Sequence, residues 1–277
     1  MNTTVKRTIF GIIFLIVMLA GFLINQYTFG ILFLVMTVGM LWEFFHMNMG
    51  KSHPVPRTIA MILGACMFIA MWAACVFTSI PFRYVSLNSI LVLALMVSIV
   101  LEKDMKDFRS VSYLFTGLFY IAAPLALSNL VVFKGGQFNG LMMLAFFIII
   151  WASDVGAYCF GMLLGQKIWP AKLCPSISPK KSWAGFWGGM LTALVAAVIM
   201  YYTGLLHFPL VHCLGMAAVM NVLGVFGDLY ESMWKRSVDI KDSSHLIPGH
   251  GGLLDRFDSA LFAIPAGVIY LVIFSLL

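Results

Sequence analysis

The sequence predicts an all-α fold, that of a polytopic integral membrane protein with about nine transmembrane helices. The first observation is the composition, since 62% of the 277 residues are hydrophobic and only 10% are charged. A soluble domain has about 25% charged residues, so most of this surface is expected to face lipid. The other two observations are a regular series of apolar runs and a strong asymmetry of lysine and arginine between them.

The apolar runs are long enough to cross a hydrocarbon core of about 30 Å at 1.5 Å per helical residue. They cover residues 8–25, 28–46, 58–80, 85–101, 111–133, 138–163, 183–205, 209–229 and 259–277. The fourth run is short and the first two nearly touch, so eight or ten helices also fit the pattern. Lys6 and Arg7 resemble the start of a signal peptide, but no Ala-x-Ala-like cleavage site follows. An uncleaved first helix is therefore predicted.

The basic residues lie almost entirely on one side of a nine-helix layout. Of the 17 Lys and Arg, only Arg83 and Lys134 fall on the side opposite the N-terminus, and all 11 Asp and Glu lie on the N-terminal side. Basic loops are retained in the cytoplasm, so we expect the N-terminus in the cytoplasm and the C-terminus outside. The net charge of +6 is then explained by membrane topology, and nucleic acid is not expected as a partner.

The chain is predicted to form one membrane domain, residues 1–277. Most of its chemistry is expected in the second half, 138–277, while the helices of 1–137 receive no role. The five cysteines form no Cys-x-x-Cys or Cys/His cluster, so buried thiols are expected instead of a zinc site or disulfides. The alternating charges of residues 102–109 are typical of a solvated connector between two helices.

Asp154 is an acidic side chain inside the apolar run 138–163. Asp154 would cost on the order of 3 kcal/mol near a bilayer centre without a partner or water, and its helix face continues with Tyr158 and Gly161. This pattern favours a helix that lines a cavity. The following loop carries Lys180 and Lys181, which suit either an anchor at lipid headgroups or a phosphate-binding role, and the spacing does not separate the two.

The segment 228–258 holds 10 of the 28 charged residues. Asp228 and Glu231 share one helix face, as do Asp255 and Asp258 where the last run begins. Three glycines within 248–252 would let main-chain N–H groups approach an anion. Since nearby carboxylates would repel a bare phosphate, a divalent cation between them is predicted, and Mg²⁺ binds such sets of carboxylate and phosphate oxygens. The alternative is a plain loop with capping acids.

These residue types suit phosphoryl or nucleotidyl transfer between a soluble nucleotide and a membrane lipid. Such reactions depend on positioning and on neutralising charge. A phosphate monoester nucleophile is mostly dianionic at pH 7, because its second pKa is about 6, so no general base is required. His250 suits a metal ligand, a general acid or a phosphate donor, and the sequence leaves these roles open.

Beyond these patterns, one run closely resembles the signature of the phosphatidate cytidylyltransferases, or CDP-diacylglycerol synthases. It reads Ser232-x2-Lys235-Arg236-x4-Lys241-Asp242-x-Ser244-x2-Ile247-Pro248-x-His250-Gly251-Gly252-Leu253-x-Asp255-Arg256-Phe257-Asp258. Asp154-Val-Gly-Ala-Tyr158 and Ser178-Pro-Lys-Lys-Ser-Trp183 are also similar to the family. Trp234 replaces an aliphatic residue or Phe, and Ser182 stands where Thr is common. The resemblance covers roughly residues 150–260.

The resemblance implies transfer of a cytidylyl group from CTP to phosphatidate with Mg²⁺, and it leaves a second cation open. It also implies a homodimer, which we expect in a bacterial inner (plasma) membrane with a cytoplasmic active site. The residues expected to act in catalysis are Lys235, Arg236, Lys241, His250 and Arg256. Those expected to bind substrate are Asp154, Ser178, Lys180, Lys181, Ser232, Gly251 and Gly252. Those expected to bind metal are Asp228, Glu231, Asp255 and Asp258.

Three other functions remain open at this point. A CTP-dependent enzyme could act on another lipid phosphate, such as a polyprenyl or ether lipid, because the signature does not describe the lipid-facing groove. An ion transporter is suggested by the acids Asp154 and Asp228 within apolar runs, although both lie near one face and no internal repeat is visible. A catalytically inactive scaffold is the third, although no residue of the signature is missing.

Overall fold

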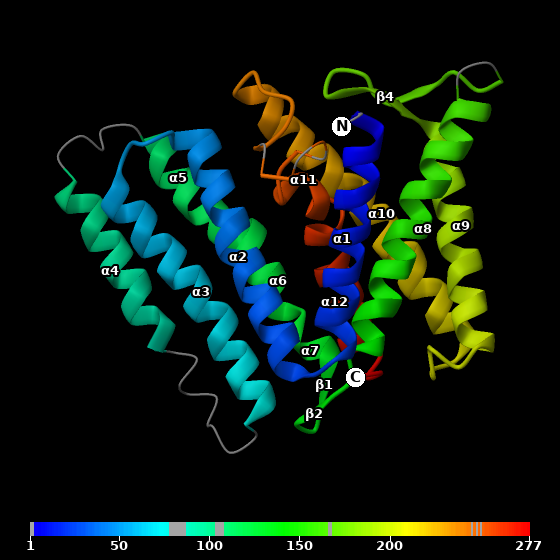
Figure 1. Cartoon of the computed structure of the whole chain (residues 1–277), viewed down its shortest axis with the longest axis horizontal. Helices are drawn as coiled ribbons and strands as arrows, with labels where there is room; N and C mark the ends of the chain where they lie inside the picture. Colours follow the sequence, from blue (N-terminus) through cyan, green and yellow to red (C-terminus); the bar gives the residue numbers. More distant parts are fainter. Residues whose placement is uncertain are drawn as a thin grey trace. The chain divides into compact units, whose positions relative to one another are not determined.

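The structure, a computed structural model, describes residues 3–77, 87–102, 108–165, 168–244, 246–247, 249 and 251–277. Helices dominate it, and the described strands form only two short hairpins (Figure 1). The chain divides into two compact units, Met1–Gly140 with Asp242–Arg256 and Leu141–Lys241 with Phe257–Leu277. The single membrane domain of residues 1–277, with halves 1–137 and 138–277, stays a prediction. The segment 242–256, however, belongs to the first unit, whose helices received no role from the sequence.

Seven helical segments of the described chain are long and apolar enough to cross a membrane, so the protein is an all-α polytopic membrane protein. They are Gln26–Met49, Pro54–Val76, Phe108–Val132, Leu141–Leu163, Trp183–Tyr202, Leu210–Ser237 and Leu254–Ile273. Two further apolar runs form the shorter helices Arg7–Leu23 and Asn88–Leu101. Every run found in the sequence thus contains a helix, while a count of nine crossing helices stays a prediction.

The first unit is built mainly from α-helices. Its elements are α1 (Thr3–Leu23), α2 (Gln26–Met49), α3 (Pro54–Val76), α4 (Asn88–Leu101), α5 (Phe108–Gly117), the π-turn η2 (Leu118–Ala122), α6 (Ala123–Leu127), α7 (Asn129–Val132), β1 (Phe133–Lys134) and β2 (Gln137–Phe138). Asn25 separates α1 from α2, since its side chain accepts hydrogen bonds from the N–H groups of Tyr27 and Thr28. Buried aromatic rings fill the space beside α2, with Phe29 and Phe33 stacked at 4.3 Å.

The second unit carries the longest helix of the chain. Its elements are α8 (Leu141–Leu163), β3 (Lys172–Cys174), β4 (Ser178–Ser182), α9 (Trp183–Tyr202), α10 (Leu210–Ser237) and α12 (Ala260–Ile273). The short helix α11 (Leu254–Phe257) begins in the first unit and ends at the first residue of the second. Ser182 begins α9 by accepting a hydrogen bond from the Gly185 N–H at 3.1 Å, and β3 pairs with β4 in the hairpin before it.

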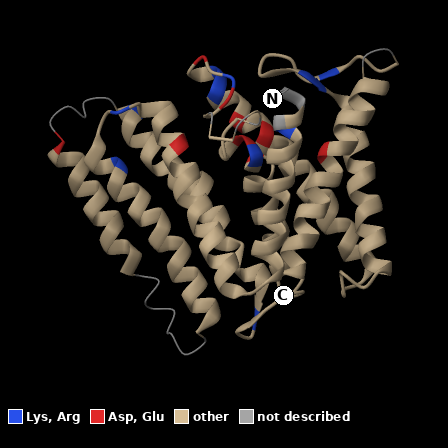
Figure 2. Cartoon of the chain, in the orientation of Figure 1, with Lys and Arg blue, Asp and Glu red and all other residues tan. Residues whose placement is uncertain are grey.

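The charged residues of the second unit lie at one end of its helices. Lys180 and Lys181 precede α9, while Asp228 and Glu231 lie in the last three turns of α10 (Figure 2). The opposite ends of α8, α9 and α10 carry no charge among the described residues (Figure 2). Such an arrangement suits chemistry at one membrane surface. Residues 103–107 of the predicted connector and Arg83 lie outside the described part, and the sidedness of the membrane stays a prediction.

Candidate active site

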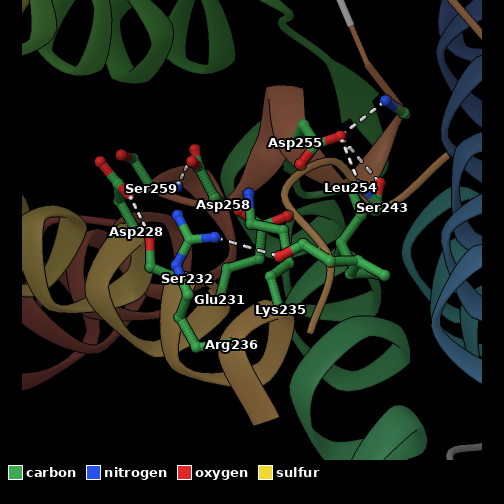
Figure 3. A network of polar contacts seen from close by, with 12 residues as sticks. Asp228, Glu231, Ser232, Lys235, Arg236, Ser243, Leu254, Asp255, Asp258 and Ser259 are labelled. Carbon is green, nitrogen blue, oxygen red and sulfur yellow. Dashed lines mark hydrogen bonds and ion pairs between the residues drawn. The ribbon is translucent and has the colours of Figure 1, made fainter. Parts of the chain in front are cut away.

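Asp228 forms an ion pair with Lys181 in the second unit. Lys181 Nζ lies 2.6 Å from Asp228 Oδ2, which joins the β4 strand to α10. The Ser232 hydroxyl, one turn further along α10, donates to Asp228 Oδ1 at 3.3 Å (Figure 3). Both side chains of the ion pair are partly exposed, at 23% for Lys181 and 33% for Asp228. The structure therefore brings together three residues that the sequence assigned to one site.

A second ion pair lies three residues further along α10. The Lys235 ammonium donates to Glu231 Oε2 at 3.0 Å, and the Glu231 side chain is fully buried (Figure 3). A buried carboxylate needs such a partner, because removing one member of the pair would leave a buried charge. This bond uses one of the two Glu231 oxygens. The predicted metal ligand Glu231 and the predicted catalytic residue Lys235 thus contact each other.

Asp258 lies where the chain leaves α11 and approaches α10. A side chain on Gly227 would place its Cβ 2.5 Å from the main-chain oxygen of Asp258, so only glycine permits this contact. The contact sets Asp258 beside the residue that precedes Asp228. The carboxylates of Asp228, Glu231 and Asp154 all lie close enough to act electrostatically on that of Asp258. The second unit thus gathers four acids, although Asp154 was predicted to bind substrate and not metal.

Asp255 takes part in a hydrogen-bond network of the first unit. Its Oδ2 accepts hydrogen bonds from the Ser243 N–H at 2.9 Å, the Ser243 hydroxyl at 3.0 Å and the Gly252 N–H at 2.7 Å (Figure 3). Carboxylate acceptors for main-chain N–H groups are favourable where a helix begins, and α11 starts at Leu254. Asp255 therefore connects the Gly-rich turn to Ser243 in the chain before it.

Glu43 is the residue of this network that the sequence missed as a site residue. It lies on α2, is 1% exposed, and accepts four hydrogen bonds from the segment 243–254. Two donors are the N–H groups of Leu253 and Leu254, and two are the hydroxyls of Ser243 and Ser244. A signal was present, because Glu43 is the single charge within the apolar run 28–46. An acid in such a run predicts a nearby partner.

The network changes the interpretation of the Gly-rich turn. The N–H group of Gly252 was expected to approach a phosphate, and it donates instead to Asp255. The N–H groups of Leu253 and Leu254, where α11 begins, donate to Glu43. Two carboxylates therefore occupy the start of α11 where an anion was predicted. Phosphate binding by the backbone of Gly251 and Gly252 stays a prediction that these bonds do not support.

The remaining predicted residues lie nearer the surface. Arg236, Lys241, Arg256 and Lys180 are exposed, and Arg236 donates to the main-chain oxygen of Ile240 at 3.2 Å. Exposed basic side chains lie where an incoming triphosphate can reach them, and their catalytic or substrate-binding roles stay predictions. Ser178 pairs with Cys174 across the β3–β4 hairpin. The predicted catalytic residue His250 lies outside the described part of the chain.

The carboxylates of the second unit fit a magnesium ion bound together with substrate. No group of three or more His, Cys, Asp and Glu side chains among the described residues is arranged to hold a metal by itself. Mg²⁺ usually takes only one or two carboxylates, with water and substrate phosphates completing its shell. Asp228 and Asp258 supply such a pair, and Asp228 already binds a cation, the ammonium of Lys181. All four predicted ligands have an oxygen in other contacts, including Asp228 with Lys181 and Ser232 and Asp258 with the Ser259 N–H. Glu231 is fully buried against Lys235, and Asp255 Oδ2 accepts three hydrogen bonds in the first unit, so these two fit less well.

Comparison with known proteins extends the likeness over nearly the whole chain. Residues 5–274 match the sequence pattern described as the cytidylyltransferase family. The phosphatidate cytidylyltransferase of Bacillus subtilis (strain 168) is 33% identical over 271 residues, which are 98% of each chain. Those of Staphylococcus haemolyticus (strain JCSC1435) and Staphylococcus aureus (strain COL) are 29% and 31% identical, over 94–95% of this chain and 95% of theirs. The likeness therefore includes both units and not only the segment 150–260.

Proposed function

Because the chain belongs to the cytidylyltransferase family, we propose that it transfers the cytidylyl group of CTP to phosphatidate, giving CDP-diacylglycerol and pyrophosphate for phospholipid synthesis. The observation that carries the proposal is the 33% identity over 98% of a phosphatidate cytidylyltransferase. The geometry is consistent with it, since acids and lysines gather at one end of the apolar helices of the second unit. A lipid phosphate and a soluble nucleotide can both reach such a place.

The proposed reaction is an in-line displacement at the α-phosphorus of CTP. A phosphate oxygen of phosphatidate forms the new P–O bond, and the bond to the β-phosphate breaks as pyrophosphate leaves. The protein must then bind and orient the triphosphate of CTP and the phosphate of phosphatidate, and it must stabilise the negative charge of the leaving pyrophosphate. Lys181 lies beside Asp228 and so provides positive charge next to the carboxylates, while the exposed Arg236 and Lys241 can approach the triphosphate.

In this proposal a bound Mg²⁺ would neutralise part of the negative charge of the CTP triphosphate. Asp228 and Asp258 would hold it, with Asp154 near them in the same unit. Metal binding by Asp255 and Glu231 is retained as a secondary proposal, because Glu231 is fully buried against Lys235 and Asp255 Oδ2 already accepts three hydrogen bonds. A second cation is left to experiment.

The arrangement of the protein in the membrane is part of the proposal. We expect the charged end of the second unit and the N-terminus in the cytoplasm of a bacterial cell, the C-terminus outside the plasma membrane, and a homodimer. The 15 to 2 distribution of Lys and Arg supports the orientation. Labelling of single cysteines placed in the loops of intact cells would test it.

The activity is tested by pyrophosphate release from CTP in detergent, with and without phosphatidate and with Mg²⁺ varied. We expect release that requires both CTP and phosphatidate. A panel that includes a polyprenyl phosphate and an ether-lipid phosphate measures the acceptor specificity. Faster turnover of either of those than of phosphatidate would contradict the proposed acceptor, and release that needs no lipid would contradict the transfer itself.

Replacing Lys181 with methionine is expected to raise the KM for CTP by roughly 10-fold or more, since charge-assisted contacts to phosphate contribute about 1.5–3 kcal/mol. Lys172→Met is the matched control, because Lys172 lies on β3 of the same hairpin and is exposed. The KM for CTP of both variants is measured by steady-state kinetics at saturating Mg²⁺. Equal KM values for the two variants would remove Lys181 from the nucleotide site.

A further inference from the structure

Glu43 is an acid buried in the interior of a membrane-spanning helix. It lies on α2 between the buried residues Leu41 and Phe44, and only 1% of its surface is exposed. Carboxylates in such segments are costly unless they have partners, and they commonly serve function. The partners of Glu43 come from a segment about 200 residues later, so the fold must bring them together. Neither the signature nor the charged segment 228–258 includes Glu43.

The four donors of Glu43 match an ionised carboxylate. Oε1 accepts from the Ser244 hydroxyl at 2.6 Å and the Leu253 N–H at 2.9 Å. Oε2 accepts from the Leu254 N–H at 2.8 Å, and it shares the single proton of the Ser243 hydroxyl, 3.2 Å away, with Asp255 Oδ2 at 3.0 Å. An ionised carboxylate is acceptor-only and has about four lone-pair sites, which these donors occupy. A glutamine would turn its NH₂ group toward one main-chain N–H, leaving that N–H without an acceptor.

The bonds of Glu43 reach both ends of the signature loop, which we define as residues 243–254. Ser243 and Ser244 lie at its beginning, whereas Leu253 and Leu254 lie at its end, where α11 starts. Asp255 closes the same loop by accepting from Ser243 and Gly252. Two carboxylates, one from α2 and one from α11, therefore fix the loop that leads into Asp255 and Arg256.

We infer that Glu43 is a positioning residue for the cytidylyl transfer, acting through the signature loop and not by touching substrate. The inference rests on the proposed function. It assigns a role to the first-unit helices, which hold the loop that carries the signature. The charge and the reach of Glu43 both matter, because four donors from two separated segments converge on one carboxylate.

The kinetic test compares Glu43→Gln with Glu102→Gln, the same change at a partly exposed acid of the first unit that lies 3.8 Å from His53. One buried N–H without an acceptor corresponds to a ~10- to 100-fold effect. We therefore expect Glu43→Gln to raise the KM for CTP at least ~10-fold, with Glu102→Gln at the wild-type value. KM does not depend on the folded fraction, so lost folding alone would not change it. A KM within about twofold of that of Glu102→Gln would overturn the inference.

The double variant Glu43→Gln with Ser244→Ala tests whether the two residues act through one another. Since Glu43→Gln already disturbs the bond to Ser244, the double variant should be no worse than Glu43→Gln alone. Independent effects that multiply would count against the loop as the route from Glu43 to the reaction.

Hydrogen exchange separates this inference from the proposed function. In the full chain in detergent, peptides containing the amides of Leu253 and Leu254 should exchange at least ~10-fold faster in Glu43→Gln than in Glu102→Gln. This readout needs no substrate. If wild-type protein released no pyrophosphate, the proposed function would fail while the exchange data still decided whether Glu43 holds the loop. Unchanged exchange would overturn the inference even in an active enzyme.

Discussion

Replacing Asp228 with asparagine should lower the rate of pyrophosphate release from CTP by about a thousandfold or more. Asp228 is the predicted metal ligand that the structure places beside a lysine, with Nζ 2.6 Å from Oδ2. Asparagine keeps the size of the side chain and removes its charge. The pair of carboxylates proposed for Mg²⁺ would then be reduced to Asp258. Loss of a single charge-stabilising group costs about 10²–10³ in rate, and weaker metal binding adds to this.

The matched control for this change is Asp239→Asn. Asp239 is also in the second unit, is exposed, and has a positive φ of 56°, a conformation that asparagine tolerates well. We expect its activity to stay within about twofold of wild type, because exposed changes away from a site have small effects. Pyrophosphate release is measured over a range of Mg²⁺ concentrations. Wild-type turnover by Asp228→Asn at limiting Mg²⁺ would contradict both the metal assignment and the importance of the acid.

The fold could be predicted from the sequence because lipid imposes a simple pattern. Long apolar runs must form helices, since no other main-chain arrangement of separate segments satisfies its hydrogen bonds in the bilayer. All nine runs contain described helices, and seven helical segments are long enough to span. The predicted end of α10 was the least accurate helix limit, because the helix continues to Ser237 whereas the apolar run ends at 229. The last turns of α10 carry charged side chains, so a prediction from hydrophobicity alone left these turns out of the helix.

The sequence could group those residues of the candidate site that share one helix or one motif. The shared face of Asp228, Glu231 and Ser232 follows from spacing on α10. The basic stretch before α9 suggested phosphate or headgroup contact for Lys181, and its ion pair with Asp228 came from the structure. Glu43 could not be found this way, because it contacts residues about 200 positions away. Spacing also did not show that the Gly252 N–H donates to Asp255 or that Glu43 accepts from the Leu254 N–H, and phosphate binding by Gly252 stays a prediction.

The second large effect is expected for Gly252→Ala, which should lower kcat/KM for CTP by roughly 100-fold or more. A Cβ at Gly252 would lie 2.6 and 2.7 Å from the two Glu43 oxygens and would also collide with the Ser243 hydroxyl. The hydroxyl can rotate away, but Glu43 is held by four donors in a buried place. The loop would have to move, and overpacking of this kind costs about 1–3 kcal/mol. Displacement of the loop that leads into Asp255 is expected to add to the loss of activity.

Gly39→Ala provides the control, because Gly39 lies on α2 and its nearest neighbour to a new Cβ is Leu253 at 4.0 Å, an ordinary contact. Activity near the wild-type value is expected there. Glu43→Asp should partly rescue Gly252→Ala, since it withdraws the carboxylate by about one bond length, ~1.5 Å, and frees space for the methyl group. The double variant is therefore expected to exceed the product of the two single effects. If the effects simply multiply, the glycine is required for another reason, such as close approach of its backbone to a phosphate, which was the first prediction for this turn.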